Sequence, residues 1–289
     1  MLKARVIRRR IRAVSKTRQI THTMEMVAAS KLRRAVERVS AARPYAAKLT
    51  EAIASLFTPE LAARYPILRQ PEPVRRAAVV LLTSNRGLAG GFNTNLIREA
   101  RLAMREWRDA GAEPELHVVG KKGINAFRFR RVPMALERSD ITDRPTMDDA
   151  RTLADPLMAR FESEAIDAVE IVFAHFKSPL STPPARLRVL PVRPSGEPGA
   201  GPAADYILEP SADEILRRVV PLYVRNAFYR ALVENAASEH GSRRTAMKNA
   251  TDNADEMIEN LTRTLNRARQ AEITLQLAEI VGGAEALKG

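Results

Sequence analysis

Two long helical patterns at opposite ends of the chain, with every strand-like segment between them, most constrain the fold. Residues 1–57 contain no glycine and one proline, Pro44. Apolar or small residues recur there at alternating steps of four and three, which is typical of a coiled-coil seam rather than of a globular helix. The seam residues are Ile7, Ile11, Val14, Ala28, Leu32, Ala35, Val39, Ala42, Ala46, Leu49, Ile53 and Leu56. Such a helix would be roughly 80 Å long, too long for burial in one compact domain.

The second pattern covers residues 211–286 and keeps the same alternation. Ser211 with Glu214 three residues later predicts a capping box at its start, because the two side chains can satisfy free amide groups of the first turn. Between Ser238 and Ala250 the pattern thins to small and polar residues around Gly241, which predicts a break or a close helix contact. The layout allows the two ends of the chain to pair with each other.

The first helix also contains two irregularities. Arg18 and Glu25 occupy seam positions, while Ile20, Met24 and Val27 form a neighbouring apolar stripe. This slip predicts that the surface met by the helix changes there. Proline lacks an amide donor, so Pro44 should bend the helix without necessarily ending it.

The middle of the chain, residues 75–209, alternates strands with helices. The expected strands are residues 77–83, 116–120, 169–173 and 187–190; the expected helices are 92–110, a stretch after residue 120, and 146–165. This order predicts an open α/β sheet, ended by a breaker-rich loop from Pro194 to Pro202. The predicted fold is therefore α/β: helices 1–57 and 211–286 form a long coiled coil around an inserted, Rossmann-like domain, 75–209.

Composition indicates a folded protein without disulfides. The chain has 289 residues, 45% of them hydrophobic and 28% charged, the balance of a soluble domain. No apolar run approaches the roughly 20 residues that span a bilayer, and the N-terminus lacks the apolar core of a secretory signal. The absence of cysteine excludes thiolate metal sites and fits a reducing compartment.

The net charge of +13 is placed unevenly. Residues 1–50 hold fourteen Lys or Arg against Glu25 and Glu37, a balance of +12. The surplus forms either a solvated face or a surface for acidic protein, lipid headgroups or nucleic acid. Nucleic acid binding would favour aromatic side chains for stacking, and this helix offers only Tyr45 and Phe57.

The residues predict no catalytic, cofactor or metal site. The loop from Gly87 to Gly91 follows a strand and precedes a helix, as in phosphate-binding turns, yet it matches neither GxGxxG nor a P-loop. We therefore interpret it as a structural turn. The four histidines lack metal-ligand spacing, and Glu259 and Arg263 should form an exposed i, i+4 pair. Two other functions stay open: a coiled-coil adaptor binding nucleic acid through its basic helix, and a small α/β nucleotide enzyme built on residues 75–209.

Four stretches carry a family resemblance. Residues 20–35 (ITHTMEMVAASKLRRA), 82–93 (LTSNRGLAGGFN), 238–254 and 269–284 resemble, in order, segments of the γ subunit of the F-type ATP synthase. The resemblance covers the whole chain and its motifs are specific.

The resemblance implies a rotor rather than a catalyst. In this family the terminal helices form an antiparallel coiled coil inside a ring of three α and three β subunits. The α/β domain meets the ε subunit and helps to seat the shaft on the membrane ring of c subunits. Proton flow turns the shaft, and ATP is made at the β sites. The implied place is the cytoplasmic face of the bacterial plasma membrane, with no cofactor, no nucleic acid and no small-molecule substrate.

The resemblance also implies contact residues. The basic first helix suits the acidic lever loops of β, and Met24, Glu239 and Arg243 match family positions at that level. Arg269, Gln270 and Thr274 match positions that meet β higher up the shaft. Gln276 stands where the family usually has glutamate, so a charged contact is not expected there. The mostly apolar end, residues 273–287, suits a pivot in an apolar sleeve. Gly282 and Gly283 should loosen its tip, because glycine costs about 1 kcal/mol in a helix interior.

Overall fold

The computed structural model describes residues 2–56, 65–192 and 212–286. The chain divides into two units, which we call the terminal helix unit (residues 1–28 and 244–289) and the sheet unit (residues 29–243). Two long helices contribute to both: α1 (Leu2–Leu56) and α6 (Ala212–Ala286). The two predicted terminal helices are thus present. Phe57, the predicted cap at Ser211, and the predicted loop from Pro194 to Pro202 lie outside the described residues.

The sheet unit contains a five-stranded sheet of order β3-β2-β1-β4-β5. Its strands are β1 (Arg76–Leu82), β2 (Glu113–Val119), β3 (Leu136–Arg138), β4 (Ala168–Ala174) and β5 (Pro184–Leu190). Val80 lies opposite His117 on one side and Ile171 on the other, in parallel register, and β5 alone among these strands is antiparallel to its neighbour. The predicted open α/β sheet is confirmed. β3 was not predicted, because it is three residues long and partly exposed.

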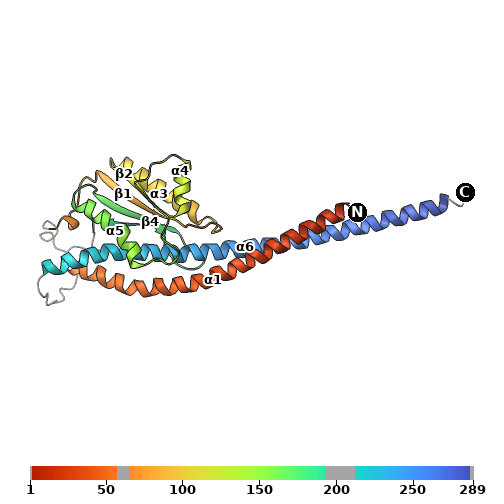
Figure 1. Ribbon diagram of the computed structural model, residues 1–289, viewed down its shortest axis with the longest axis horizontal. Coiled ribbons are helices and arrows are strands. Elements are labelled where there is room, and N and C mark those ends of the chain that lie inside the picture. Colours follow the sequence, from red (N-terminus) through yellow and green to blue (C-terminus); the bar gives the residue numbers. More distant parts are fainter. Residues whose placement is uncertain (1, 57–64, 193–211, 287–289) are drawn as a thin grey trace. The chain divides into compact units, whose positions relative to one another are not determined.

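Helices cover both faces of the sheet, which explains the continuous apolar run of β1. Alternate residues Ala77, Val79 and Leu81 pack with α3 (Phe92–Asp109) and α4 (Lys121–Phe129). Ala78, Val80 and Leu82 face α5 (Met147–Glu162) and α6. Within the sheet unit, Figure 1 shows α3 on one side of β1 and β4 and α6 on the other.

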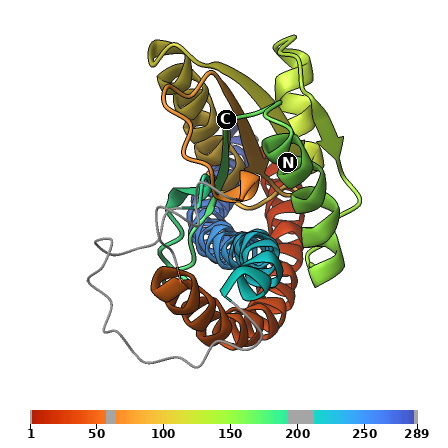
Figure 2. The same cartoon turned by 90° about the vertical axis from the view of Figure 1, so that its left-hand side faces the viewer.

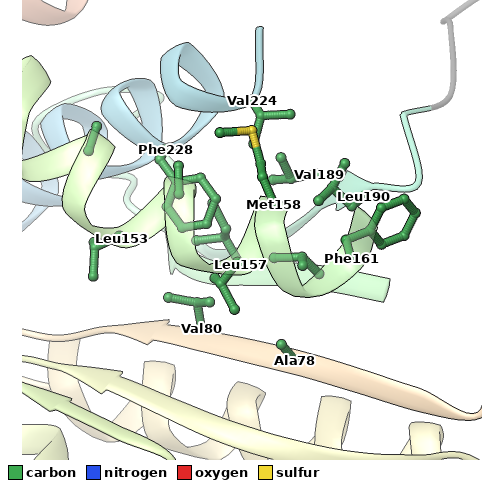
Figure 3. Close-up of a cluster of buried hydrophobic side chains, with 14 of the residues drawn as sticks. Ala78, Val80, Leu153, Leu157, Met158, Phe161, Val189, Leu190, Val224 and Phe228 are labelled. Atoms are coloured by element: carbon green, nitrogen blue, oxygen red, sulfur yellow. The ribbon is translucent and has the colours of Figure 1, made fainter. Parts of the chain in front are cut away.

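The core under α5 is the largest buried hydrophobic cluster of the sheet unit among the described residues. Leu157 and Phe161 of α5 lie between β1 and the helix residues Val224 and Phe228 of α6 (Figure 3). A short 3-10 helix, η1 (Pro66–Leu68), adds Ile67 and Leu68 to the same cluster. α5 begins with a capping box between Thr146 and Asp149. Trp107 of α3, at 8% exposure, belongs to the core on the opposite face of the sheet.

α6 is continuous through Gly241, so the alternative of a break at that point is wrong. Residues 231–241 are buried without interruption. A Cβ atom on Gly241 would lie 3.1 Å from the carbonyl oxygen of Pro179, in the loop between β4 and β5. The small residues therefore allow close approach of a loop, rather than ending the helix.

Within the sheet unit, α1 and α6 pack together. Leu32, Ala35 and Val39 of α1 form one cluster with Val233 and Ala237 of α6. Figure 2 shows the two helices side by side beneath the sheet. α1 continues past Pro44, as expected.

Candidate partner-binding surfaces

A buried ion pair on α6 lies beside the glycine loop of the sheet unit. Nη2 of Arg243 donates a hydrogen bond of 2.6 Å to Oε1 of Glu239, and Nε and Nη2 each donate at 3.3 Å to the carbonyl oxygen of Gly87. The side chains of Arg243 and Glu239 are 11% and 9% exposed. Burial raises the pKa of Glu239, and the charge of Arg243 opposes that rise. The pair thus fastens α6 to the loop after β1.

A second polar group in the sheet unit joins α1, α6 and the loop after β3. Nζ of Lys31 donates to Oδ2 of Asp143 at 2.6 Å, and Nε2 of His240 lies 3.5 Å from the same oxygen. Burial, with help from the nearby positive charges of Arg243 and Lys31, lowers the pKa of His240 to about 4 despite Asp143. Nδ1 of His240 is buried without a hydrogen-bond partner. His240 is therefore neutral at physiological pH.

The glycine loop is tied down by its own side chains. Oδ1 of Asn93 accepts a hydrogen bond of 3.0 Å from the amide of Ser84, and the hydroxyl of Ser84 donates to the carbonyl of Arg86 at 2.6 Å. Gly90 has a φ of 58°, a conformation that glycine adopts without strain. These contacts, with Arg243 on Gly87, support the interpretation of the loop as a structural turn.

A cavity of about 240 Å³ lies at the carboxyl ends of β1 and β2. Thr83 and Ser84 line it from the sheet, Asp143 from the loop after β3, and Asn235 and Glu239 from α6. Ligands of open α/β sheets bind at this edge. Here Asp143 and Glu239 are already engaged with Lys31 and Arg243, so the cavity borders the network that fastens the helices.

The terminal helix unit contains polar contacts between its antiparallel helices, beside buried apolar side chains such as Ile7 and Ala254. Nη1 of Arg18 donates to Oδ1 of Asp255 at 2.9 Å, and the hydroxyls of Thr21 and Thr251 lie 2.8 Å apart. Arg18, at the predicted slip of the seam, forms a half-exposed ion pair with α6. Met24 is partly buried here.

Large apolar side chains remain exposed on the terminal helix unit. Ile20, Met26 and Val27 of α1 are each more than half exposed. From Ile273 to Val281 the apolar side chains of α6 are exposed too. The pairing of residue 21 with 251 places the start of α1 opposite residues near 270. The following part of α6 therefore extends past the start of α1 as a single helix (Figure 1).

The seven predicted contact residues lie in different surroundings, some covered and some exposed. Glu239 and Arg243 lie together in the sheet unit, covered by their own chain. Arg269, Gln270, Thr274 and Gln276 are exposed along one stretch of α6, where the hydroxyl of Thr274 donates to the carbonyl of Gln270 at 2.9 Å. The Lys31, Asp143 and His240 group was not predicted, because Lys31 and Asp143 are 112 residues apart and no pattern relates them.

The described part of the chain contains neither a membrane-spanning helix nor a candidate metal cluster. Within residues 2–56, 65–192 and 212–286, no helix is both long enough and apolar enough to cross a membrane. Among the same residues, His, Asp and Glu side chains nowhere gather in a group of three or more suited to a metal ion.

Comparisons with known proteins give one family. A family model described as ATP synthase matches residues 3–287. A protein of Gemmatimonas aurantiaca named ATP synthase gamma chain is 54% identical over 290 residues, covering 100% of both chains. The protein of that name from Leptospira biflexa is 41% identical and covers 99% of this chain and 100% of its own.

Solved structures show the same fold. A chain in the mitochondrial ATP synthase of Euglena gracilis, in an assembly titled OSCP/F1/c-ring, has a TM-score of 0.66 at 19% identity, covering 99% of this chain and 94% of its own. A chain from the central stalk and c-ring of the Tetrahymena thermophila enzyme has a TM-score of 0.60 at 24% identity, covering 80% of this chain and 99% of its own. With the full-length match to bacterial relatives, these observations lead to one conclusion: the chain belongs to the family of ATP synthase gamma chains.

Proposed function

We propose that this chain is the central-stalk rotor of a bacterial ATP synthase. It turns inside the ring of α and β subunits and couples proton flow through the c-ring to ATP synthesis or hydrolysis at the β subunits. Its partners are α, β, ε and the c-ring. The chain has no active site of its own and works at the cytoplasmic face of the plasma membrane, held there by the complex.

The exposed apolar surface of the terminal helix unit is the observation that carries this proposal. Ile273, Leu275, Leu277, Ile280 and Val281 lie on a helix segment that its own chain does not cover. Monomeric proteins rarely expose such contiguous apolar surface, which marks contact with a partner. The segment carries few charges, so fixed ion pairs would not hold it at one angle in an apolar sleeve. This end of α6 is therefore suited to rotate within a partner.

The predicted β contacts divide into two groups. Met24 on α1, with Arg269, Gln270, Thr274 and Gln276 on α6, has side-chain surface available for a partner. Glu239 and Arg243 are mostly covered by the sheet unit, so any contact they make with β uses the small fraction that stays exposed. Gln276 contributes no charge.

A rotating shaft can couple proton flow to ATP synthesis only if its contacts with the β subunits change with its angle. A rotor angle can bias a β site only if its contacts differ among the conformations of that site. The terminal helix unit is asymmetric, because α1 is basic and covers only part of α6, while the end of α6 is apolar and single. Successive β sites would therefore meet different surfaces.

Reconstitution tests the proposal directly. The full chain is combined with purified α and β subunits of the same organism, and ATP hydrolysis and rotation of a bead attached to the chain are recorded. We expect stable assembly, hydrolysis that depends on the chain, and stepwise rotation. Failure to assemble, or hydrolysis without rotation, would contradict the proposal.

The variant Met24→Lys tests one contact. A lysine ammonium at a partly buried apolar position would oppose docking of β, so we expect proton-driven ATP synthesis in membrane vesicles to fall about tenfold while the chain still folds and assembles. Gln19→Lys is the control, because it adds the same charge at an exposed position on another face of α1. Equal synthesis rates in the two variants would exclude a β contact at Met24.

A further inference from the structure

A second cavity, of about 310 Å³, lies on the face of the sheet opposite to α6. It is bordered by α3, α4, β2 and Val132, which follows α4. Its floor is apolar and is formed by Leu102, Met104, Leu116, Phe127 and Val132. Its rim is formed by four arginines of α3. We call this site the arginine groove. None of its residues belongs to the surfaces described above.

The four rim arginines follow helical spacing. Arg98, Arg101, Arg105 and Arg108 are separated by three, four and three residues, so they share one face of α3 over about 15 Å. All four side chains are exposed. Leu102, in their midst, is 40% exposed. The groove thus presents a row of positive charge along an apolar floor.

These arginines have no acidic partner among the described residues. Arg98 donates only to the side-chain oxygen of Asn95, at 3.3 Å. Several other arginines of the sheet unit are paired with carboxylates: Arg186 with Glu99 and Glu106 on a different side of α3, Arg69 with Asp167, Arg160 with Glu115, and Arg225 with Asp155. Like charges at this spacing repel along a helix. Carboxylates arriving from outside would relieve that repulsion.

We propose that the arginine groove binds an acidic amphipathic helix of a partner protein. Carboxylates at i, i+3 and i+7 match a row of guanidinium groups spaced in the same way, and each pair can form charge-assisted hydrogen bonds. An apolar side chain between them enters the cavity above Leu102 and Phe127. This is the recognition of a helix in a groove, with electrostatic complementarity setting its direction.

The shape of the site favours a peptide over a bilayer. A bilayer surface is broad and flat, and it would meet the protruding arginines without filling the cavity between them. A single phosphate group would engage one or two guanidiniums and leave the rest of the row unmatched. A helix with carboxylates and one apolar ridge satisfies both the row and the floor.

The test uses the full-length chain and a fluorescein-labelled synthetic helix of 16 residues with a leucine ridge flanked by glutamates. Binding is followed by fluorescence anisotropy. Two control peptides replace the glutamates with glutamine, or the leucines with serine. We expect binding of the parent peptide alone, weakening as salt concentration rises. Equal binding of the serine peptide would overturn the proposal, because charge alone would then explain the interaction.

Matched variants separate the groove from the general positive charge of the chain. Arg101→Gln with Arg105→Gln should weaken binding at least tenfold. Arg8→Gln with Arg9→Gln, which removes the same charge from an exposed part of α1, should weaken it less than twofold. Leu102→Ser should weaken it several-fold without changing the salt dependence. Circular dichroism checks that each variant is folded.

Two further results would overturn the proposal. One is an equal loss of affinity in the two double variants. The other is tight binding to phosphatidylglycerol vesicles that depends on Arg101 and Arg105 while the peptide does not bind, which would assign the groove to a lipid surface.

Discussion

Two ion pairs on α6 have the same spacing and the same geometry but different surroundings. Arg243 with Glu239 in the sheet unit, and Arg263 with Glu259 in the terminal helix unit, are both i, i+4 pairs with an Nη2 to Oε1 distance of 2.6 Å. The first pair is 11% and 9% exposed, and the second 64% and 67%. Burial, not the motif, therefore decides what the pair does. In one unit it fastens the helix to the loop of Gly87; in the other it lies in water.

Breaking each pair should give the largest contrast. Arg243→Met leaves the carboxylate of Glu239 buried without its partner, which costs about 3–5 kcal/mol of unfolding free energy. Arg263→Met removes an exposed pair and should cost less than about 0.5 kcal/mol. Urea unfolding of the two variants at pH 8 measures the difference. Similar losses in both would show that the two units hold α6 in the same way.

The stability of Arg243→Met should also depend on pH, because the variant leaves the carboxylate of Glu239 buried. Burial raises the pKa of Glu239, so the folded protein binds its proton more tightly than the unfolded chain does. Protonation removes the buried charge, and stability is regained as the pH falls through the raised pKa. The defect of Arg243→Met should therefore be smaller at pH 5 than at pH 8. An unchanged or larger defect at pH 5 would assign it to lost packing.

His240 provides the next largest effect. The folded protein lowers the pKa of His240 from 6.5 to about 4, so between these values the unfolded chain binds a proton that the folded chain does not. This contribution to stability is intact above pH 6.5 and is lost as the pH falls, by up to about 3 kcal/mol. In urea unfolding across this range, His240→Gln should lose less stability than the wild type. The exposed His22→Gln should follow the wild type; if it behaves like His240→Gln, the assignment to burial is wrong.

The sequence predicted those features that have a period. The apolar alternation predicted both long helices, the continuous run from Ala77 to Leu82 predicted a strand covered on both faces, and the spacing of Glu259 and Arg263 predicted their pair. The spacing of two charged residues does not indicate whether the pair is buried. Glu239 and Arg243 have the same spacing, and only the fold covers them.

Features that depend on distant segments were not predictable. Asp143 lies in a loop after the short strand β3, and nothing in its neighbourhood indicates that Lys31 and His240 meet it. The thinned pattern around Gly241 fitted a break or a close contact equally well, since both need small residues. The structure shows a close contact with the loop of Pro179, which lies 62 positions earlier in the sequence than Gly241.

Replacing a glycine of α6 by alanine should have opposite effects on stability in the two units. These are the smallest of the predicted stability changes. Gly282→Ala meets nothing within 4 Å, so the helix there should gain about 1 kcal/mol from the better helix propensity of alanine. At Gly241 the added methyl group would lie 3.1 Å from the carbonyl of Pro179, and that oxygen belongs to a backbone that must move to admit it.

Hydrogen exchange and urea unfolding measure these two effects separately. Gly282→Ala should slow amide exchange in the neighbouring turns of α6 by about fivefold and leave the unfolding of the sheet unit unchanged, because the gain is local. Gly241→Ala should show no gain, or a loss of up to about 1 kcal/mol, since strain offsets the propensity. A gain of about 1 kcal/mol at Gly241 would mean that the loop of Pro179 yields easily, and that α6 is less tightly held in the sheet unit than its burial indicates.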